Sequence, residues 1–336
     1  MARIAVLGAG SWGSTFALVL AAAGHSPVLW TRREEVAREI RERRRNSAYL
    51  GDRELPDSLS ASADISEVLS GADGIVMSLP AQSLRENLER WRGLPAFAQG
   101  LPSVPVLSLA KGIERGTDLR MSEVIAEAGG LDPSLIAVLS GPNLAGEIAA
   151  EQPCASVIAA PQEQLARELA SWCDAPYFRA YTSSDVIGVE VAGAVKNVIA
   201  IAVGAAAGLG YGDNTRASLI TRGLAEISRF GVALGGQAQT FAGLAGMGDL
   251  VATCASPLSR NHRLGAALGA GLGLDEAVRE VGQTAEGVAT ARAVAHMAER
   301  LGIDMPITRG VVAVVDGGTP ISEVTTALLS RSVRAE

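Results

Sequence analysis

Lys196 places an ammonium group within a small and apolar stretch, Val191-Ala192-Gly193-Ala194-Val195-Lys196-Asn197-Val198-Ile199-Ala200. A lysine in such surroundings must be paired with an opposite charge or partly desolvated. Burial disfavours the charged form, so such a lysine can exchange a proton near neutral pH, as the reduction of a carbonyl group requires. A structural lysine that pairs with a carboxylate or extends to the surface would give the same pattern, so both interpretations stay open here.

A second polar set follows later in the chain. Asp249 lies within Gly246-Met247-Gly248-Asp249-Leu250, where we expect a glycine-rich turn, and the next polar stretch begins with a helix that we expect to start at Pro257. Ser259, Arg260 and Asn261 then offer a forked cation, neutral donors and free N–H groups at a helix start. This combination suits a phosphate group, with an ordinary capped helix and solvated arginines as the alternative.

Two loops in the N-terminal half point to the same chemistry. Lys111 follows the strand candidate that ends at Leu109, and Gly141 and Asn143 follow the one that ends at Ser140. The carboxyl ends of strands are where open α/β sheets bind ligands, so Lys111 has a route to a substrate or cofactor phosphate. A plain surface lysine and a glycine that only shapes a turn are the alternatives.

A glycine fingerprint, Gly8-Ala9-Gly10-Ser11-Trp12-Gly13, lies between the first apolar strand candidate and a helical pattern. In a dinucleotide site Gly8 allows the tight turn, Gly10 lets backbone N–H groups approach the pyrophosphate, and Gly13 lets the helix pack on the sheet. The helix N-terminus then faces the anion. The placement, more than the glycines in a chain with 38 of them, predicts a bound dinucleotide.

The end of the second strand candidate predicts which dinucleotide is preferred. NAD-selective sites usually carry an acidic residue there, whereas this chain reads Trp30-Thr31-Arg32-Arg33. Two guanidinium groups suit a 2′-phosphate, so Arg32 and Arg33 predict a preference for NADPH, with NADH as the other cofactor. Alternatively, the two arginines lie in solvent at the start of the next helix, with their positive charge partly offset by Glu34 and Glu35.

The elements that must position these residues fall into two groups. Strand candidates alternate with helical patterns up to about residue 184, which predicts a doubly wound, mainly parallel sheet. Long Ala- and Gly-rich helical patterns follow, including a buried central helix over 189–210. We therefore expect an α/β protein with a dinucleotide-binding domain over 1–185 and an all-helical substrate domain over 186–336. The strand candidates are 2–7, 27–31, 74–78, 104–109, 136–140 and 155–160.

Composition and charge exclude several classes of protein. The 336 residues carry a net charge of −7, which argues against sequence-independent nucleic-acid binding. The run over 189–210 is interrupted by Glu190, Lys196 and Asn197, which argues against a membrane span. Three cysteines without ligand spacing suit a reducing compartment, and the N-terminus shows no export signal, so we expect a cytoplasmic protein. The three scattered histidines imply no metal.

Taken together, these motifs closely resemble the bacterial NAD(P)-dependent glycerol-3-phosphate dehydrogenase family, and they occur in family order along almost the whole chain. The stretches that carry the resemblance are 8–13, 79–80, 110–114, 140–147, 191–197, 212–215, 246–249, 257–261 and 286–287.

The resemblance implies a Rossmann domain followed by a helical domain like that of 6-phosphogluconate dehydrogenase. It also implies reversible hydride transfer between NAD(P)H and dihydroxyacetone phosphate, giving sn-glycerol 3-phosphate for phospholipid synthesis. By analogy Lys196 is the proton donor in reduction and the acceptor in oxidation, and Asp249 orients Lys196 or a substrate hydroxyl. Relatives are commonly dimers, which implies a homodimer that the sequence itself leaves open.

The matching site positions form two overlapping sets. Substrate-contacting positions of the family correspond to Lys111, Gly141, Asn143, Lys196, Asp249, Ser259, Arg260 and Asn261. Cofactor-contacting positions correspond to Ser11, Trp12, Arg32, Lys111, Ala145, Arg260, Thr284 and Glu286, to which charge adds Arg33 and the fingerprint adds Gly8, Gly10 and Gly13.

Two departures and two alternatives accompany this interpretation. Asn143 stands where many relatives have Ser or Thr, and Thr284 and Ala285 precede Glu286 where relatives are often more apolar. A ketopantoate or 3-hydroxyacid reductase could use Arg260 to bind a carboxylate. A regulator that senses NADPH without turnover is the alternative outside enzymes, and it would have little use for Lys196 together with Asp249.

Overall fold

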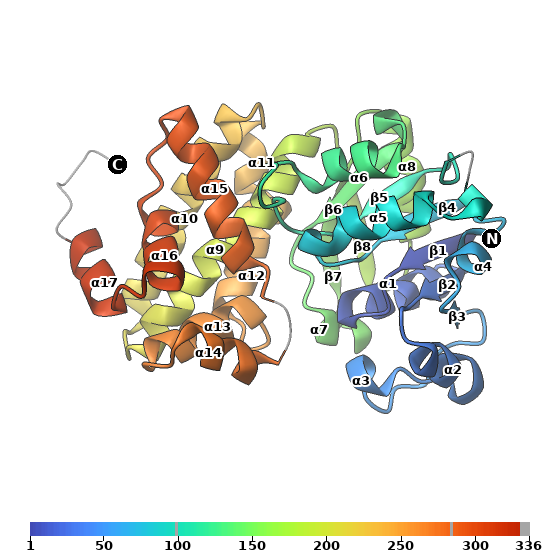
Figure 1. Cartoon of the computed structure of the whole chain (residues 1–336), viewed down its shortest axis with the longest axis horizontal. Coiled ribbons are helices and arrows are strands. Elements are labelled where there is room, and N and C mark those ends of the chain that lie inside the picture. Colours follow the sequence, from blue (N-terminus) through green and yellow to red (C-terminus); the bar gives the residue numbers. More distant parts are fainter. Residues whose placement is uncertain (98–99, 283–284, 330–336) are drawn as a thin grey trace. The chain divides into compact units, whose positions relative to one another are not determined.

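The structure is a computed structural model that describes residues 1–97, 100–282 and 285–329 (Figure 1). The chain divides into two compact units. The first comprises Met1–Lys111 and Leu119–Glu190, and the second comprises Gly112–Asp118 and Val191–Glu336. The predicted division between 185 and 186 differs from this in two respects: the main boundary follows Glu190, and a short segment from the N-terminal half belongs to the helical unit.

A twisted sheet in the order β3-β2-β1-β4-β5-β6-β7-β8 forms the centre of the first unit. Neighbouring strands are parallel except for the antiparallel pair β6 and β7. The strand order reverses at β1 and β4, and such a switch point is where doubly wound sheets bind ligands. The strands are β1 (Arg3–Leu7), β2 (Ser26–Trp30), β3 (Ser60–Ser62), β4 (Gly74–Met77), β5 (Val106–Ser108), β6 (Ile136–Ser140), β7 (Cys154–Ala159) and β8 (Phe178–Ser183).

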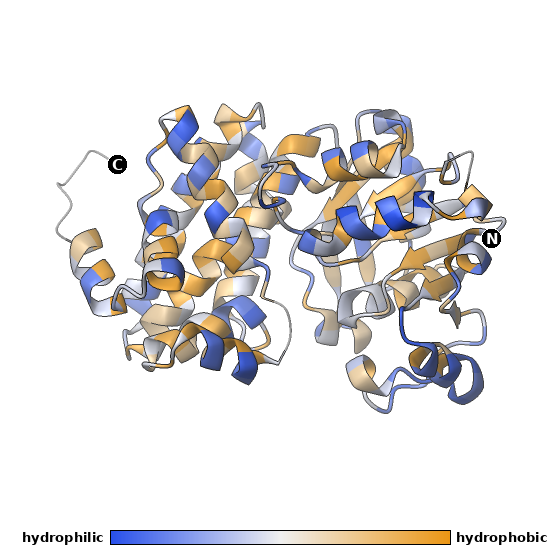
Figure 2. Cartoon of the chain, in the orientation of Figure 1, coloured by the Kyte–Doolittle hydropathy of each residue, from blue (hydrophilic) through white to orange (hydrophobic). Residues whose placement is uncertain are grey.

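Helices cover both faces of this sheet. One apolar core joins the sheet to α1, α2 and α8, and another joins it to α4, α5 and α6. The central strands are therefore apolar along most of their length, as Figure 2 shows, because both of their faces are buried. The helices are α1 (Ser11–Ala22), α2 (Glu34–Arg43), α3 (Ser47–Leu50), α4 (Ile65–Leu69), α5 (Leu84–Arg92), α6 (Met121–Gly129), α7 (Ala145–Ala149) and α8 (Glu163–Trp172).

All six predicted strands are present, and the sheet has two more than the sequence indicated. β3 is the three-residue strand Ser-Ala-Ser, and β8 is largely exposed. Both lie at the edges of the sheet, where one side of the strand needs no apolar run. Hydropathy patterns therefore identified the buried strands and missed the edges.

The described part of the second unit is helical, with α9 (Val186–Gly208) beginning in the first unit and forming the buried centre of the second. Its length and composition would suit a membrane span, but 83% of its most apolar window is buried inside the protein, as for a core helix. The other helices are α10 (Asp213–Ala233), α11 (Ala238–Ala242), α12 (Asp249–Ala255), α13 (Arg260–Gly269), α14 (Leu274–Val281), α15 (Gly287–Leu301), α16 (Pro306–Gly317) and α17 (Ile321–Leu329).

Glycines bring α9 and α13 into backbone contact. A Cβ on Gly204 would lie 2.0 Å from the carbonyl oxygen of His262, and a Cβ on Gly265 would lie 2.0 Å from that of Ile201. Side chains larger than hydrogen would separate the two helices at these points. The Ala- and Gly-rich composition of the C-terminal half thus sets the spacing between the helix of Lys196 and the helix that begins at Arg260.

Candidate active site

The glycine fingerprint forms a tight turn between β1 and α1, at the switch point of the sheet. Gly8 has φ +126°, and a Cβ there would lie 2.5 Å from the carbonyl oxygen of Ser78. A Cβ on Gly13 would lie 1.9 Å from the carbonyl oxygen of Gly8. Both positions therefore require glycine for the turn itself, whereas nothing lies within 4 Å of the place where a Cβ on Gly10 would be.

This turn fits a pyrophosphate. Gly10 is the N-cap of α1, so no side chain caps the first-turn N–H groups, and the space where a Cβ on Gly10 would lie is open. Asn46 is fully buried, and its Nδ2 donates to the Ala9 carbonyl (3.1 Å) and to the Ser14 hydroxyl (2.9 Å). These hydrogen bonds stabilise the turn. Trp12 stacks edge-on against Phe16, and its buried Nε1 has no hydrogen-bond partner among the described residues.

Arg32 and Arg33 are both exposed directly after β2. Glu34 pairs with Arg41 at 2.7 Å. Within the described ranges, only the 4.0 Å contact between Arg33 and Glu35 links the two arginines to a carboxylate. Among the described residues Arg32 has no hydrogen bond or ion pair. The neighbouring glutamates therefore do little to neutralise these guanidinium groups. Sequence reasoning did not select Tyr49, whose ring lies 6.0 Å from the Arg33 guanidinium carbon.

Lys111 and Gly141 meet at the carboxyl ends of β5 and β6, where Lys111 Nζ donates to the Gly141 carbonyl at 3.0 Å. Gly141 has φ +155°, and a Cβ there would lie 2.9 Å from the Cα of Ser156, so the turn requires glycine. The Ser156 hydroxyl donates to Asn143 Oδ1 at 2.5 Å, which leaves the buried Asn143 Nδ2 without a partner among the described residues. The bulkier Asn143 is thus held by β7.

Ala145, the first residue of α7, adjoins the cofactor turn, because its carbonyl accepts a hydrogen bond from the Thr15 hydroxyl at 3.3 Å. Two predicted parts of the cofactor site, the glycine fingerprint at 8–13 and Ala145, are therefore linked through Thr15 of α1.

Lys196 meets a carboxylate and a hydroxyl inside the second unit. Its Nζ donates to Asp249 Oδ1 and to Thr253 Oγ1, both at 2.5 Å, and Thr253 Oγ1 lies 3.2 Å from the same Asp249 oxygen. The three residues are 6%, 1% and 5% exposed. Sequence reasoning missed Thr253, although it lies one helical turn after Asp249 and therefore on the same face.

The backbone around Asp249 is helical rather than the expected glycine-rich turn. Residues Leu244–Gly248 form a π-helical turn that leads directly into α12, of which Asp249 is the first residue. Gly246 is required there, since a Cβ would lie 2.1 Å from the carbonyl oxygen of Phe241. The carboxylate is therefore fixed by regular helical backbone rather than by a flexible loop.

The predicted phosphate residues occupy the start of α13, which begins at Arg260 and not at Pro257, since Pro257 lies in the preceding turn. Ser259 is the N-cap, and its hydroxyl accepts from the His262 N–H at 3.3 Å. Arg260 is exposed and makes no ion pair with any residue that the structure describes. A free guanidinium thus stands at the N-terminus of a ten-residue helix.

Asn261 links α13 to the start of α15. Its Oδ1 accepts from the Gly287 N–H at 3.0 Å, and Gly287 follows the N-cap residue Glu286. A Cβ on Gly287 would lie 2.7 Å from the Asn197 carbonyl oxygen, so this corner also touches the helix of Lys196. Predicted substrate and cofactor positions of the second unit are thereby brought together. The predicted cofactor residue Thr284 lies outside the described residues.

Two family models match most of the chain. Residues 3–166 match the family model of the NAD-dependent glycerol-3-phosphate dehydrogenase N-terminus, and residues 185–326 match that of its C-terminus. The chain belongs to the NAD-dependent glycerol-3-phosphate dehydrogenase family. The match includes both the glycine fingerprint and the Lys196–Asp249 pair.

Relatives cover the whole chain. It is 50% identical to glycerol-3-phosphate dehydrogenase [NAD(P)+] of Corynebacterium jeikeium over 100% of both chains, and 52% identical to that of Thermobifida fusca over 100% and 99%. Among solved structures, glycerol-3-phosphate dehydrogenase from Coxiella burnetii has a TM-score of 0.91 at 37% identity, over 98% of this chain and 99% of that one. Membership of this family decides against the ketopantoate and 3-hydroxyacid reductases.

Two other features of the chain lie outside this chemistry. Cys254 is buried beside Lys196 and Asp249, and burial raises the pKa of its thiol to about 12, so it is a poor nucleophile. A cavity of about 1290 Å³ between α9, α10, α16 and α17 contains none of the predicted site residues. Over residues 1–97, 100–282 and 285–329, no cluster of His, Cys, Asp and Glu could hold a metal ion.

Proposed function

We infer that this chain catalyses the reversible reduction of dihydroxyacetone phosphate to sn-glycerol 3-phosphate with NADPH or NADH. The observation that carries the chemistry is the buried contact of Lys196 with Asp249 and Thr253 in a member of the glycerol-3-phosphate dehydrogenase family. An ammonium group held between a carboxylate and a hydroxyl is oriented, shielded from bulk water and able to transfer a proton.

The first unit supplies the cofactor site. The first turn of α1 holds the pyrophosphate through its N–H groups, with Gly8, Gly10 and Gly13 providing room and Ser11, Trp12 and Ala145 lining the turn. Arg32 and Arg33 hold the 2′-phosphate of NADPH, and the Tyr49 ring offers an apolar surface beside them. The resemblance to the family adds Arg260, Thr284 and Glu286 as further cofactor contacts.

The phosphorylated substrate requires cations and neutral donors. Arg260, at the N-terminus of α13, supplies a forked cation to the phosphate, with Ser259 and Asn261 as neutral groups. The resemblance to the family adds Lys111, Gly141 and Asn143 as further substrate contacts. A phosphate is favoured over a carboxylate because five side chains in this set can donate hydrogen bonds, those of Lys111, Asn143, Ser259, Arg260 and Asn261.

The proton-transfer step falls to Lys196. Hydride comes from the reduced nicotinamide when the cofactor is bound. As the carbonyl carbon receives it, the electron pair of the C=O π bond moves onto oxygen, and Lys196 Nζ gives that oxygen a proton. Asp249 and Thr253 hold Lys196 in place, and in the reverse direction the neutral amine accepts the proton.

An absorbance assay tests the reaction. Purified protein is given dihydroxyacetone phosphate or unphosphorylated dihydroxyacetone, each with NADPH or NADH. We expect rapid oxidation of NADPH with the phosphorylated ketone alone, because the unphosphorylated one leaves Arg260 and its neighbours without a partner. Absence of turnover with either cofactor would contradict the proposal, and equal rates with both ketones would contradict the phosphate site.

The setting of the reaction is also a proposal. The product supplies glycerophospholipid synthesis, the enzyme works in the cytoplasm, and it acts as a homodimer. These proposals rest on family resemblance. Sedimentation at several protein concentrations tests the dimer.

A further inference from the structure

The chain crosses between the two units at three points: after Lys111, after Asp118 and after Glu190. Glu190 is the last residue of the first unit at the third crossing, and it already belongs to α9, the helix that carries Lys196. Arg120 and Ser122 follow the second crossing closely. Any change at these positions therefore acts where the two units are covalently joined.

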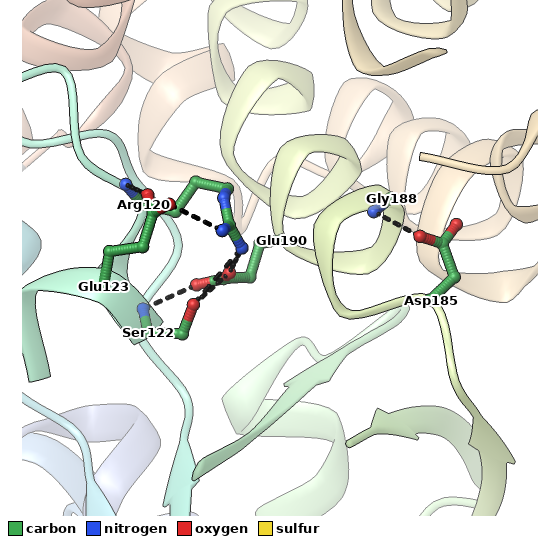
Figure 3. Close-up of polar contacts among 6 residues, drawn as sticks. All are labelled: Arg120, Ser122, Glu123, Asp185, Gly188 and Glu190. Atoms are coloured by element: carbon green, nitrogen blue, oxygen red, sulfur yellow. Dashed lines mark hydrogen bonds and ion pairs between the residues drawn. The ribbon is translucent and has the colours of Figure 1, made fainter. Parts of the chain in front are cut away.

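Glu190 is almost fully buried, with 5% of its side chain exposed, and its carboxylate accepts three hydrogen bonds from one short segment. Ser122 donates from its backbone N–H at 2.8 Å and from its hydroxyl at 2.6 Å, and Arg120 Nη1 donates at 2.6 Å. Figure 3 shows this cluster beside the start of α9. Burial raises the pKa of Glu190, and Arg120 and Ser122 oppose that rise.

The first turn of α9 is held at a second place. Asp185 Oδ1 accepts from the Gly188 N–H at 2.9 Å, also drawn in Figure 3, and a Cβ on Gly188 would lie 2.0 Å from Asp185 Oδ2. The helix is therefore capped on one side and tied to the start of α6 on the other. Because an α-helix is continuous, a shift along its axis or a rotation about that axis at its start also moves the residues that follow.

Lys196 lies six residues after Glu190, about 9 Å further along the same helix. We propose that Glu190 is a positioning residue, which fixes α9 against Arg120 and Ser122 and thereby sets where Lys196 presents its proton. The proposal rests on the proposed role of Lys196. A displacement of about 1 Å at a reacting group can cost about 100-fold in rate, so the anchor of this helix matters to kcat.

The test compares Glu190→Gln with a matched control. Gln keeps the size of Glu190 but cannot accept from all three donors, whereas Glu123→Gln alters a carboxylate that also binds Arg120 (2.8 Å) without touching α9. Ser122→Ala, which removes one of the three donors, is the milder variant should Glu190→Gln not fold. Each full-length variant is assayed for kcat, KM for dihydroxyacetone phosphate, the NADPH dissociation constant by fluorescence, and the urea midpoint.

We expect Glu190→Gln to lower kcat about 10- to 100-fold, Ser122→Ala to lower it less, and Glu123→Gln to leave it near wild type. The NADPH dissociation constant stays unchanged, because the fingerprint turn is untouched. A lower urea midpoint with unchanged kcat would mean that Glu190 is only structural and would overturn the proposal.

A double-mutant cycle separates action through Lys196 from action at another site. If Glu190 acts through Lys196, Glu190→Gln lowers kcat little further once Lys196 is Ala. Full additivity would overturn the positioning role. If Glu190→Gln keeps a normal kcat while Lys196→Ala is inactive, only the positioning role of Glu190 is overturned. If Lys196→Ala also keeps a normal kcat, the proposed role of Lys196 as proton donor is overturned as well.

Discussion

Lys111 and Lys196 are the only lysines in a chain with 29 lysine and arginine residues. Arginine serves nearly every other cationic position, including ion pairs on α2 and α6. Arginine stays protonated in proteins, whereas a lysine can release and regain a proton. The retention of lysine at a buried position that contacts a carboxylate therefore favours proton transfer over a purely structural ion pair.

Substitutions at Lys196 distinguish proton transfer from a structural ion pair. We expect Lys196→Ala to lower kcat by about 10²- to 10⁴-fold, the usual contribution of a general acid. Lys196→Arg keeps a positive charge beside Asp249 but cannot release its proton, so we expect it to stay nearly as inactive. Steady-state kinetics with dihydroxyacetone phosphate measure both. Substantial activity in the Arg variant would assign Lys196 a structural role.

Arg32 carries the predicted cofactor preference. Arg32→Ala should lower kcat/KM for NADPH by about 10- to 100-fold, since a hydrogen bond to a charged group contributes about 1.5–3 kcal/mol. The value for NADH should change little, because NADH has no 2′-phosphate. Arg38→Ala, an equally exposed arginine on α2, is the control. Equal losses with both cofactors would show that Arg32 does not recognise the 2′-phosphate.

At the level of elements, close helix packing decides which residues meet. Gly204 and Gly208 on α9 face Gly265 and Gly269 on α13, and a Cβ on any of the four would lie 2.0–2.3 Å from a backbone oxygen of the other helix. Backbones that approach so closely leave little freedom to slide. The contact fixes the start of α13, with Arg260 and Asn261, relative to Lys196.

Gly265→Ala tests this contact. A new methyl group 2.0 Å from the Ile201 carbonyl oxygen forces the backbones apart, so we expect the free energy of unfolding to fall by about 1–3 kcal/mol. The control is Gly146→Ala in α7, where nothing lies within 4 Å of the new Cβ and the better helix propensity should add up to about 1 kcal/mol. Urea midpoints measure both. An unchanged midpoint in Gly265→Ala would show that the interface yields easily.

At the level of the whole molecule, stability depends on a buried carboxylate that joins distant segments. Glu226 on α10 is 1% exposed and accepts from the Ile307 N–H at 2.6 Å and from the N–H and hydroxyl of Thr308 at 3.2 Å, which caps the start of α16. Burial raises the pKa of Glu226 above its ordinary 4.5, opposed by these hydrogen bonds and by Arg229.

The raised pKa gives a pH dependence with a definite sign. The folded protein binds the proton more tightly than the unfolded chain, so this contribution to stability is complete below pH 4.5 and is lost as the pH rises through the folded pKa. Wild type should therefore lose stability relative to the non-titrating Glu226→Gln between pH 4.5 and 7. Urea unfolding across that range measures the difference. The exposed Glu299→Gln serves as control, and a constant difference would contradict the raised pKa.

The sequence by itself determined the local features of this protein. The apolar strands 4–7 and 74–77 and the glycine fingerprint were readable because buried parallel strands are apolar throughout and tight turns demand glycine. The family was readable because its motifs occur in order. The edge strands gave no such signal, because β3 is only three residues long and β8 is largely exposed.

Tertiary structure decided what brings distant residues together. Lys196 and Asp249 are 53 residues apart, and only the packing of α9 against α12 places their charged atoms at 2.5 Å. Thr253 and Glu190 have no motif that marks them, because a hydroxyl and a carboxylate become significant only when their partners are known. Side-chain contacts between remote segments depend on the packing of whole helices, which the periodicity of a single segment does not encode.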